Sequence, residues 1–409
     1  MAEILTFEGQ IADLFGGLFY PGRLTVAGGK ITEIERLAVA PLDYIFPGYV
    51  NAHVHLESCC VAPSEAARHF PRHGVVGTVS DPHEIANVLG VPGIEWMAED
   101  LLKRGTSGRL KTLFGVPSCV PSCGPGNQFE TAGATIGLED VANLLPRFPY
   151  LAEVMNFPGV LGRDSFVMAM LKIALDQGVP IDGHAPGVMG DDARRYAEAG
   201  PSTDHECTTL KEALDKIAAG MKIIIREGSA ARNFDALWPL LNSHPDMVMF
   251  CADDKHPDEL AIPSEDRHRG DVDALIRRAV DNGVPLMNAL KAASVNPVRH
   301  YRLPIGLLRE GDPADFLVID DLNSLRVKQT YIDGQLVAEN GVSLQPFLEP
   351  SVVNNFNCSP IARDAIVVSS TEMGGTCELM RVVGINDGQL VTDELLLKPK
   401  IESGNVVSD

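Results

Sequence analysis

Between residues 44 and about 300, short apolar runs alternate with longer helical patterns, and this alternation leaves few folds open. Such a rhythm is typical of a parallel sheet with crossover helices. Eight strand–helix units in about 250 residues match the size of a (β/α)8 barrel, so the sequence predicts an α/β fold of the TIM-barrel type. The expected strands are 45–55, 75–80, 110–116, 150–157, 179–184, 201–207, 221–226 and 247–254.

The two ends of the chain have a different texture, in which short β-rich runs are separated by turns. Arg23–Val26 and Lys30–Ile34 lie between glycine and proline pairs, and similar runs return at Ala314–Asp320 and Arg326–Val337. We expect these ends to pair into one small β domain. The expected divisions are 1–43 and 304–345 for the two parts of that domain, 44–303 for a catalytic barrel, and 346–409 for the start of a C-terminal segment that is incomplete.

Composition narrows the classes of partner. A chain of 409 residues with 45% hydrophobic residues can bury a sizeable core. Its formal charge of −21 argues against nucleic acid or an anionic membrane as a partner, because phosphates would be repelled. No signal peptide and no spanning apolar stretch is visible, which predicts a cytoplasmic protein. A small uncharged or cationic substrate fits this surface, and a homo-oligomer stays open.

Histidines and carboxylates fall at the predicted C-terminal ends of several strands, where barrels of this type keep their chemistry. His53 and His55 are two residues apart on one strand, so both side chains point to one face. Taken singly, each such residue could instead be solvated, part of a turn, or hydrogen-bonded in a core. Together they suit Zn, Mn or Fe, and they suffice for a two-metal site. The other strand ends carry Asp81-Pro82-His83-Glu84, Glu153, Asp182-Gly183-His184, Asp204-His205-Glu206 and Asp253-Asp254.

A second metal pattern has to be weighed against this one. Zinc deaminases of nucleobases carry His-x-Glu followed by Pro-Cys-x-x-Cys, and His55-Leu-Glu57 with Pro117-Ser-Cys119 and Cys123 superficially resembles it. The spacing fails, because three residues separate Cys119 from Cys123 and Pro117 is not adjacent to Cys119. That pattern would also leave the histidines and aspartate of the later strands without a role.

Strings spread over nearly the whole chain resemble the adenine deaminase family of the amidohydrolase superfamily. The string Asp81-Pro-His-Glu-Ile-Ala-Asn-Val-Leu-Gly90 is specific, because the wider superfamily does not share it. The resemblance also rests on residues 47–57, 203–206, 226–233, 253–257 and 294–300.

The resemblance implies two divalent metal ions, with Mn or Fe favoured and Zn as the alternative. It assigns them to His53, His55, Glu153, His184, His205 and Asp253. Many amidohydrolases bridge their metals with a carboxylated lysine at the end of strand four. This chain has Glu153 at that position, which favours the deaminase over hydantoinase-like relatives.

The implied reaction is hydrolytic deamination of adenine to hypoxanthine and ammonia by metal-activated water, with Asp253 as general base. Asp253 is preferred to Asp254 because only one of two consecutive strand residues faces the barrel axis. Glu84 is expected to protonate the purine ring, with Asp81 and His83 beside it in the substrate site. The alternative for Glu84 is a helix start, where a carboxylate interacts with the helix dipole.

Two departures from the family qualify the transfer. Glu57-Ser-Cys-Cys stands where the family usually has Glu-Ser-Ser-Met, and the chain is expected to be shortened at its C-terminus relative to typical members. Two other functions therefore stay open. One is an amidohydrolase that acts on a different heterocycle or cyclic amide, and the other is a truncated homologue that binds a ligand without turnover.

Overall fold

The computed structural model describes residues 3–103, 105, 108–122, 131–260, 269–353, 355, 357–369 and 379–407. The chain divides into two compact units, Met1–Pro350 and Ser351–Asp409, which we describe separately. In the described ranges, none of the helices combines the length and the apolar character needed to cross a membrane.

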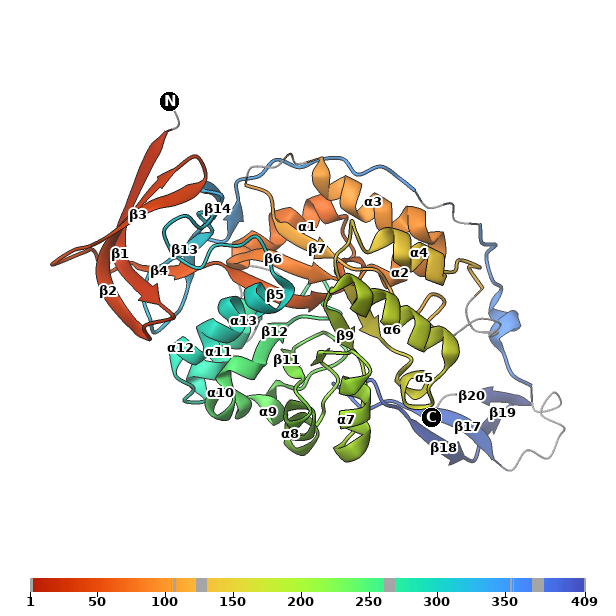
Figure 1. The fold of residues 1–409 in the computed structure, drawn as a ribbon. Helices are drawn as coiled ribbons and strands as arrows, with labels where there is room; N and C mark the ends of the chain where they lie inside the picture. The colour runs from red at the N-terminus through yellow and green to blue at the C-terminus, as the bar shows by residue number, and fades with distance from the viewer. Residues whose placement is uncertain are drawn as a thin grey trace. The chain divides into compact units, whose positions relative to one another are not determined.

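Eight short strands form the centre of the first unit (Figure 1). Each lies within one of the runs predicted from the sequence. They are β5 (Tyr49–Val54), β6 (Val75–Ser80), β7 (Lys111–Phe114), β8 (Leu151–Val154), β9 (Ile181–Gly183), β10 (Thr203–Asp204), β11 (Lys222–Arg226) and β12 (Val248–Cys251). The strands pair in parallel as β5-β6-β7, β8-β9 and β10-β11-β12.

Isolated bridges and backbone hydrogen bonds join these three groups of strands. The neighbours in space are therefore the neighbours in sequence, and the last strand returns to the first, as the (β/α)8 fold requires. The joining pairs are Val116 with Leu151, Ser202 with Ile181, and Asp253 with Val54.

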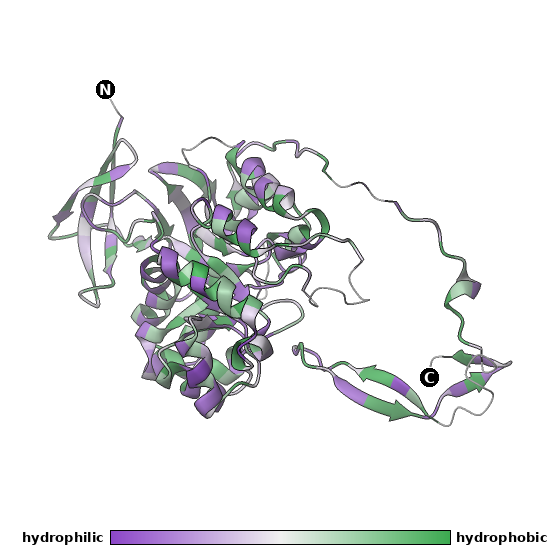
Figure 2. Ribbon diagram, turned by 45° about the vertical axis from the view of Figure 1, so that its right-hand side comes forward, coloured by the Kyte–Doolittle hydropathy of each residue, from purple (hydrophilic) through white to green (hydrophobic). Residues whose placement is uncertain are grey.

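Helices follow the strands and cover the outside of this ring. Figure 2 shows that they carry both hydrophilic and hydrophobic residues, as expected for helices with one face on a core. The helices are α1 (Pro63–His69), α2 (His83–Leu89), α3 (Val91–Leu102), α4 (Leu138–Leu144), α5 (Phe157–Leu161), α6 (Ser165–Gln177), α7 (Gly190–Glu198), α8 (Leu210–Ala218), α9 (Phe234–Leu237), α10 (Leu240–Ser243), α11 (Val272–Asp281), α12 (Leu286–Leu290) and α13 (Asn296–Tyr301).

Helix α6 illustrates how the local sequence sets these elements. Asp164 precedes the helix, and its carboxylate accepts the backbone N–H groups of Phe166 and Val167 at 3.0 Å each. Gly178 ends the helix with a φ of 66°, a left-handed conformation that glycine adopts without strain. The buried positions follow the i, i+3, i+4, i+7 spacing of one helical face: Val167, Met170, Leu171 and Ala174.

Strands β1–β4 and strands β13–β16, from the two ends of the first unit, form one eight-stranded sheet beside the barrel (Figure 1). The two ends meet where β4 pairs with β13 in antiparallel register. In spatial order the strands are β16 (Val342–Ser343), β15 (Gln335–Glu339), β14 (Val327–Ile332), β13 (Phe316–Ile319), β4 (Tyr44–Pro47), β1 (Ile4–Asp13), β2 (Leu18–Ala27) and β3 (Lys30–Arg36). The division of the chain into domains at the predicted bounds stays a prediction.

The predicted first strand, 45–55, is wrong as a single element. Its first residues belong to β4 in the eight-stranded sheet, and the rest form β5 in the barrel. The chain passes from one to the other at Gly48, where a Cβ atom would lie 2.3 Å from Val76 Cγ2. Only glycine fits this close approach without displacing Val76.

In its described residues, the second unit has two antiparallel hairpins and a segment that leads to them. Met380–Gly384 (β17) pairs with Asp393–Leu397 (β18), and Lys400–Glu402 (β19) pairs with Asn405–Val407 (β20). A bridge between Ser369 and Asn405 ties the leading segment to the second hairpin.

Candidate metal centre

Three of the predicted ligands come together where the first and last barrel strands meet. His53 and His55 extend from β5 with their Nε2 atoms 3.1 Å apart. Asp253 follows β12, and its Oδ1 lies 3.2 Å from His55 Nε2 and 3.5 Å from His53 Nε2. All three side chains are buried. The two histidines therefore point to one face, as their spacing predicts.

The other predicted ligands lie beside this group, with Glu153 of β8 between the two. Glu153 Oε2 lies 2.6 Å from Nδ1 of His184, which follows β9, and 3.2 Å from Nε2 of His205, which follows β10. Glu153 Oε1 faces the other way, 3.4 Å from His55 Nε2. The rings of His53 and His205 stack with their centroids 4.1 Å apart. The structure thus brings all six predicted ligands into one cluster.

The hydrogen bonds of His55 leave a nitrogen available for a cation. Its Nδ1 lies 3.0 Å from the carbonyl oxygen of Asp81, an acceptor, so Nδ1 carries the proton and donates. Its Nε2 then faces the carboxylates of Asp253 and Glu153, where it would offer a lone pair to a bound cation. Carboxylates that converge in a buried space need positive charge beside them, from a cation or from protonated histidines. This donor set fits a divalent cation, with the Asp81 carbonyl orienting the ring.

The pKa shifts in the cluster also indicate that it favours positive charge. Burial alone would raise the pKa of Glu153, but His184 and the neighbouring histidines hold it well below its usual range. Burial alone would lower the pKa of His205, but Glu153 and Glu206 raise it well above the ordinary value. The carboxylates therefore create a negative potential that favours bound positive charge.

The predicted substrate residues after β6 lie at the edge of this cluster. His83 Nδ1 is 3.1 Å from Asp81 Oδ2 and 3.3 Å from Glu153 Oε1, so His83 touches the ligand group itself. Glu84 is in the first turn of α2, with Oε1 3.2 Å from His83 Nε2 and Oε2 3.4 Å from His55 Nδ1. The side chain of Glu84 is 35% exposed, against 1% for Asp81 and 14% for His83. Of these three, Glu84 is the most accessible to a molecule in solution.

Both consecutive aspartates at the end of the eighth strand approach the cluster. Strand β12 ends at Cys251, and Asp253 has a φ of 56°, so the strict alternation of strand side chains no longer applies there. Asp253 is buried, whereas Asp254 is half-buried and accepts a hydrogen bond from the Ser58 hydroxyl. An oxygen of Asp254 still lies within 4.8 Å of ligand atoms of His55 and Glu84. Asp253 is the deeper of the two.

Sequence reasoning gave no role in the site to two charged residues that lie beside the ligands, Arg226 and the strand-end residue Glu206. Arg226, the last residue of β11, places Nη1 2.7 Å from Asp253 Oδ2 and Nη2 2.8 Å from Glu206 Oε2. Glu206 Oε1 in turn lies 3.3 Å from His205 Nε2. Burial would raise the pKa of Glu206, but His205 and then Arg226 hold it at about 2. The available signal was a charged residue that closes an apolar run, which Arg226 does.

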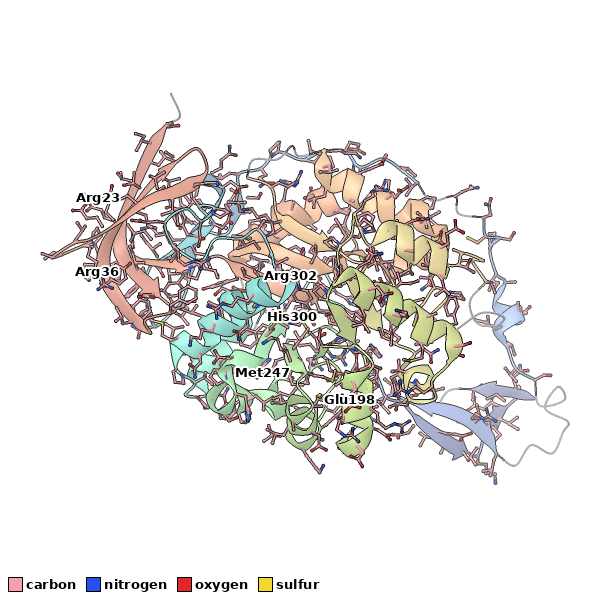
Figure 3. All side chains as sticks on the ribbon, in the orientation of Figure 1. Arg23, Arg36, Glu198, Met247, His300 and Arg302 are labelled. Atoms are coloured by element: carbon pink, nitrogen blue, oxygen red, sulfur yellow. The ribbon has the colours of Figure 1, made fainter. Side chains whose placement is uncertain are left out.

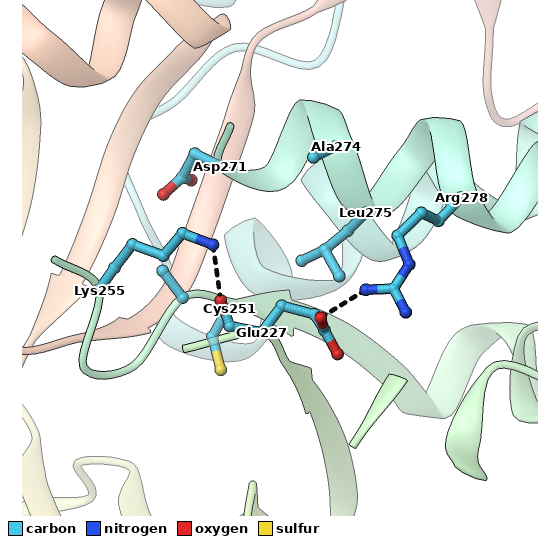
Figure 4. Close-up of a pocket in the computed structure, with 8 residues that line it drawn as sticks. Glu227, Cys251, Lys255, Asp271, Ala274, Leu275 and Arg278 are labelled. Atoms are coloured by element: carbon cyan, nitrogen blue, oxygen red, sulfur yellow. Dashed lines mark hydrogen bonds and ion pairs between the residues drawn. The ribbon is translucent and has the colours of Figure 1, made fainter. Parts of the chain in front are cut away.

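A small cavity between the ends of β11 and β12 and helix α11 is not the substrate site (Figure 4). It leaves about 10 Å³ for the centre of a water molecule, which is room for a single water. Lys255 Nζ donates to the carbonyl oxygen of Glu227 at 2.9 Å beside it, and Arg278 forms an ion pair with the Glu227 carboxylate. A purine would not enter this space.

The structure gives no support to the alternative zinc site with cysteine ligands, as judged from Cys119. Burial raises the pKa of the Cys119 thiol, which disfavours the thiolate that a zinc site needs. Cys123 lies outside the described residues.

Comparison with known proteins places the chain in a family. Residues 44–337 match the model of the amidohydrolase family. An adenine deaminase of Salinibacter ruber is 46% identical over 100% of this chain and 72% of its own length. An adenine deaminase of Methanosarcina mazei is 47% identical over 98% of this chain and 72% of its own length.

A likeness among solved structures concerns the fold alone. The crystal structure of N-acetylglucosamine-6-phosphate deacetylase from Thermotoga maritima superposes with a TM-score of 0.59 at 14% identity, covering 82% of this chain and 100% of that one. The strand ring and the family match agree on the TIM-barrel fold of these hydrolases. The chain belongs to the amidohydrolase family and, within it, is a relative of the adenine deaminases.

Proposed function

We propose that this protein catalyses the hydrolytic deamination of adenine, in which water and adenine yield hypoxanthine and ammonia. The substrate follows from adenine deaminases that are 46% and 47% identical over essentially the whole chain. The observation that carries the chemistry is the position of Glu153, whose two carboxylate oxygens face two different groups of histidines.

The ligand set follows from that position. One divalent cation would be held by His53, His55 and Asp253, a second by His184 and His205, with Glu153 between them. When bound, such ions supply Lewis acidity that lowers the pKa of a water molecule towards about 7. Imidazole and carboxylate donors admit Mn, Fe or Zn; we favour Mn or Fe, because the relatives are adenine deaminases.

Asp253 is the proposed general base. It accepts a proton from the water that attacks C6 of the purine and later delivers a proton to the departing amine. Arg226 holds Oδ2 of this carboxylate at 2.7 Å, so Oδ1 stays turned towards His53 and His55. Glu84 is the proposed acid that donates a proton to N1 and takes one back from the hydroxyl formed at C6, because it combines proximity to His55 with partial exposure.

We also propose a small β domain of residues 1–43 and 304–345 beside a catalytic barrel of residues 44–303, with the correction that β4 (Tyr44–Pro47) belongs to the sheet of the small domain. A separate cluster of buried apolar side chains supports this division. It includes Leu24, Ile31 and Phe316.

The test compares two neighbouring carboxylates. Asp253→Asn should lower the rate of hypoxanthine and ammonia formation from adenine by at least about 10²-fold, the usual contribution of a general base. Asp254→Asn is the matched control, and it should keep most of the activity. The reverse pattern would assign the base to Asp254.

Elemental analysis of wild type grown with Mn, Fe or Zn accompanies this assay. Bound metal without ammonia release from adenine would contradict the proposed reaction, and it would favour another substrate or a binding function. Activity confined to the zinc form would contradict the preference for Mn or Fe.

A further inference from the structure

A fully buried lysine lies beside the loops that carry His184 and His205. Lys216 is on α8, and its ammonium donates to the carbonyl oxygen of Ala185 at 2.7 Å and to Glu212 Oε1 at 2.9 Å. Asp204 Oδ1 lies 3.2 Å from the same nitrogen. The ammonium group therefore has two hydrogen bonds and a second carboxylate as an ion-pair partner. A buried charge is tolerated when it is paired and hydrogen-bonded in this way.

The two carboxylates use their other bonding positions on backbone N–H groups. Asp204 accepts the N–H of Ala185 at 2.9 Å and the N–H of Glu206 at 2.7 Å. Glu212 accepts the N–H of Gly187 at 2.8 Å and the N–H of Thr208 at 3.1 Å. These groups belong to the two loops that follow β9 and β10. The network therefore fixes the path of both loops.

Two of these backbone groups are adjacent to proposed metal ligands. Ala185 follows His184 directly, and Glu206 follows His205 directly. All hydrogen bonds of the network described above stay between residues 185 and 216. His53, His55 and Asp253 are positioned by different contacts, including the hydrogen bond from Asp253 N to the carbonyl oxygen of His53. The network around Lys216 thus includes none of these three ligands, and Arg226 makes one contact between the two halves, joining the Glu206 side chain to Asp253.

We propose that Lys216, through Asp204 and Glu212, is a positioning residue for one half of the metal centre. It holds His184 and His205 where they bind their cation tightly, and it leaves the half formed by His53, His55 and Asp253 unaffected. The inference rests on the two-metal centre proposed above. Its consequence is an asymmetric loss of metal, which a general loss of stability would not produce.

The test is Mn²⁺ binding to Lys216→Met, measured by elemental analysis after dialysis and by calorimetric titration. Methionine keeps the length of the side chain and removes its charge. Lys211→Met is the matched control, because Lys211 lies on the same helix and pairs with Asp215 at 2.8 Å but is 73% exposed. Glu212→Gln, a milder change in the same network, is the second variant in case Lys216→Met does not fold.

Wild type and Lys211→Met should bind two ions per chain with the same affinities. The network variants should bind one ion as wild type does and the other about 10- to 100-fold more weakly, the usual effect of removing a residue that supports a ligand. Equal weakening of both ions, or two ions bound with wild-type affinity in both network variants, would overturn the inference. A wild-type protein that binds no pair of ions would overturn the metal centre itself and the inference with it.

Discussion

Replacement of Arg226 by methionine should destabilise the metal-free protein by about 3–5 kcal/mol, the usual cost of removing one partner from a buried ion pair. The guanidinium lies between Asp253 and Glu206, at 2.7 Å and 2.8 Å from their carboxylate oxygens. All three side chains are at most 5% exposed. Methionine keeps an unbranched side chain without charge, so the variant leaves two buried carboxylates without the guanidinium.

The loss should be smaller when the metal site is filled. Asp253 Oδ1 faces His53 and His55, so a cation bound there would replace part of the positive charge that Arg226 supplies. A metal ion that binds the folded state and not the unfolded state also stabilises both proteins. The variant and wild type should therefore differ less with Mn²⁺ than with a chelator.

The assay is urea unfolding of each protein with chelator and with Mn²⁺. Arg23→Met is the matched control, because Arg23 also bridges two carboxylates, Glu8 and Glu35, at 2.7 Å each. Arg23 lies on the eight-stranded sheet, where it is 39% exposed (Figure 3). Water screens such a pair, so its urea midpoint should not change measurably. A metal-free loss below about 1 kcal/mol for Arg226→Met, or one no larger than that of the control, would refute the reasoning.

Two further predictions concern Glu84 and the buried ion pair of His73 with Asp273. Glu84→Gln should lower turnover about 10²- to 10⁴-fold with metal content and thermal stability near wild type, whereas turnover within about threefold would reduce Glu84 to a helix start. His73 is buried with Nδ1 3.2 Å from Asp273 Oδ1; burial alone would lower the pKa of His73, but Asp273 raises it. That stabilisation is complete below the unfolded pKa of about 6.5 and is lost as pH rises through the higher folded pKa. Despite burial, Arg277 and then His73 lower the pKa of Asp273, so its share is present above about pH 4 and is lost at lower pH. The difference in melting temperature between wild type and His73→Gln should accordingly be largest near pH 5–6 and shrink above about pH 7, and a difference that does not vary with pH would contradict this.

Local sequence was sufficient to predict the barrel strands. Every barrel strand lies inside one predicted apolar run, because the burial of a parallel strand on both faces leaves a continuous apolar signal. The apolar runs did not show which sheet a strand joins. Residues 45–55 read as one run, yet the packing of Val76 against Gly48 separates β4 from β5.

The same limit applies to the candidate site. The residues proposed as ligands were visible as histidines and carboxylates at strand ends, because strand ends of a barrel converge at one mouth. Their roles as ligands stay a proposal. The register of Asp253 and Asp254 could not be read from alternation, since the chain leaves the strand conformation at Asp253.

The sequence thus shows which chemical groups are available, but it does not show which of them contact one another. Local patterns predict the barrel and place histidines and carboxylates in order at its strand ends. These residues are His53, His55, Glu153, His184, His205 and Asp253. The link from Arg226 to Glu206 and Asp253 joins residues 20 and 27 positions apart, and that from Lys216 to Ala185 spans 31. Such contacts depend on how neighbouring strands and helices are placed in space, because a buried charge is satisfied by whichever groups the packing brings within hydrogen-bond distance. Only the tertiary structure decides which carboxylates and backbone groups those are.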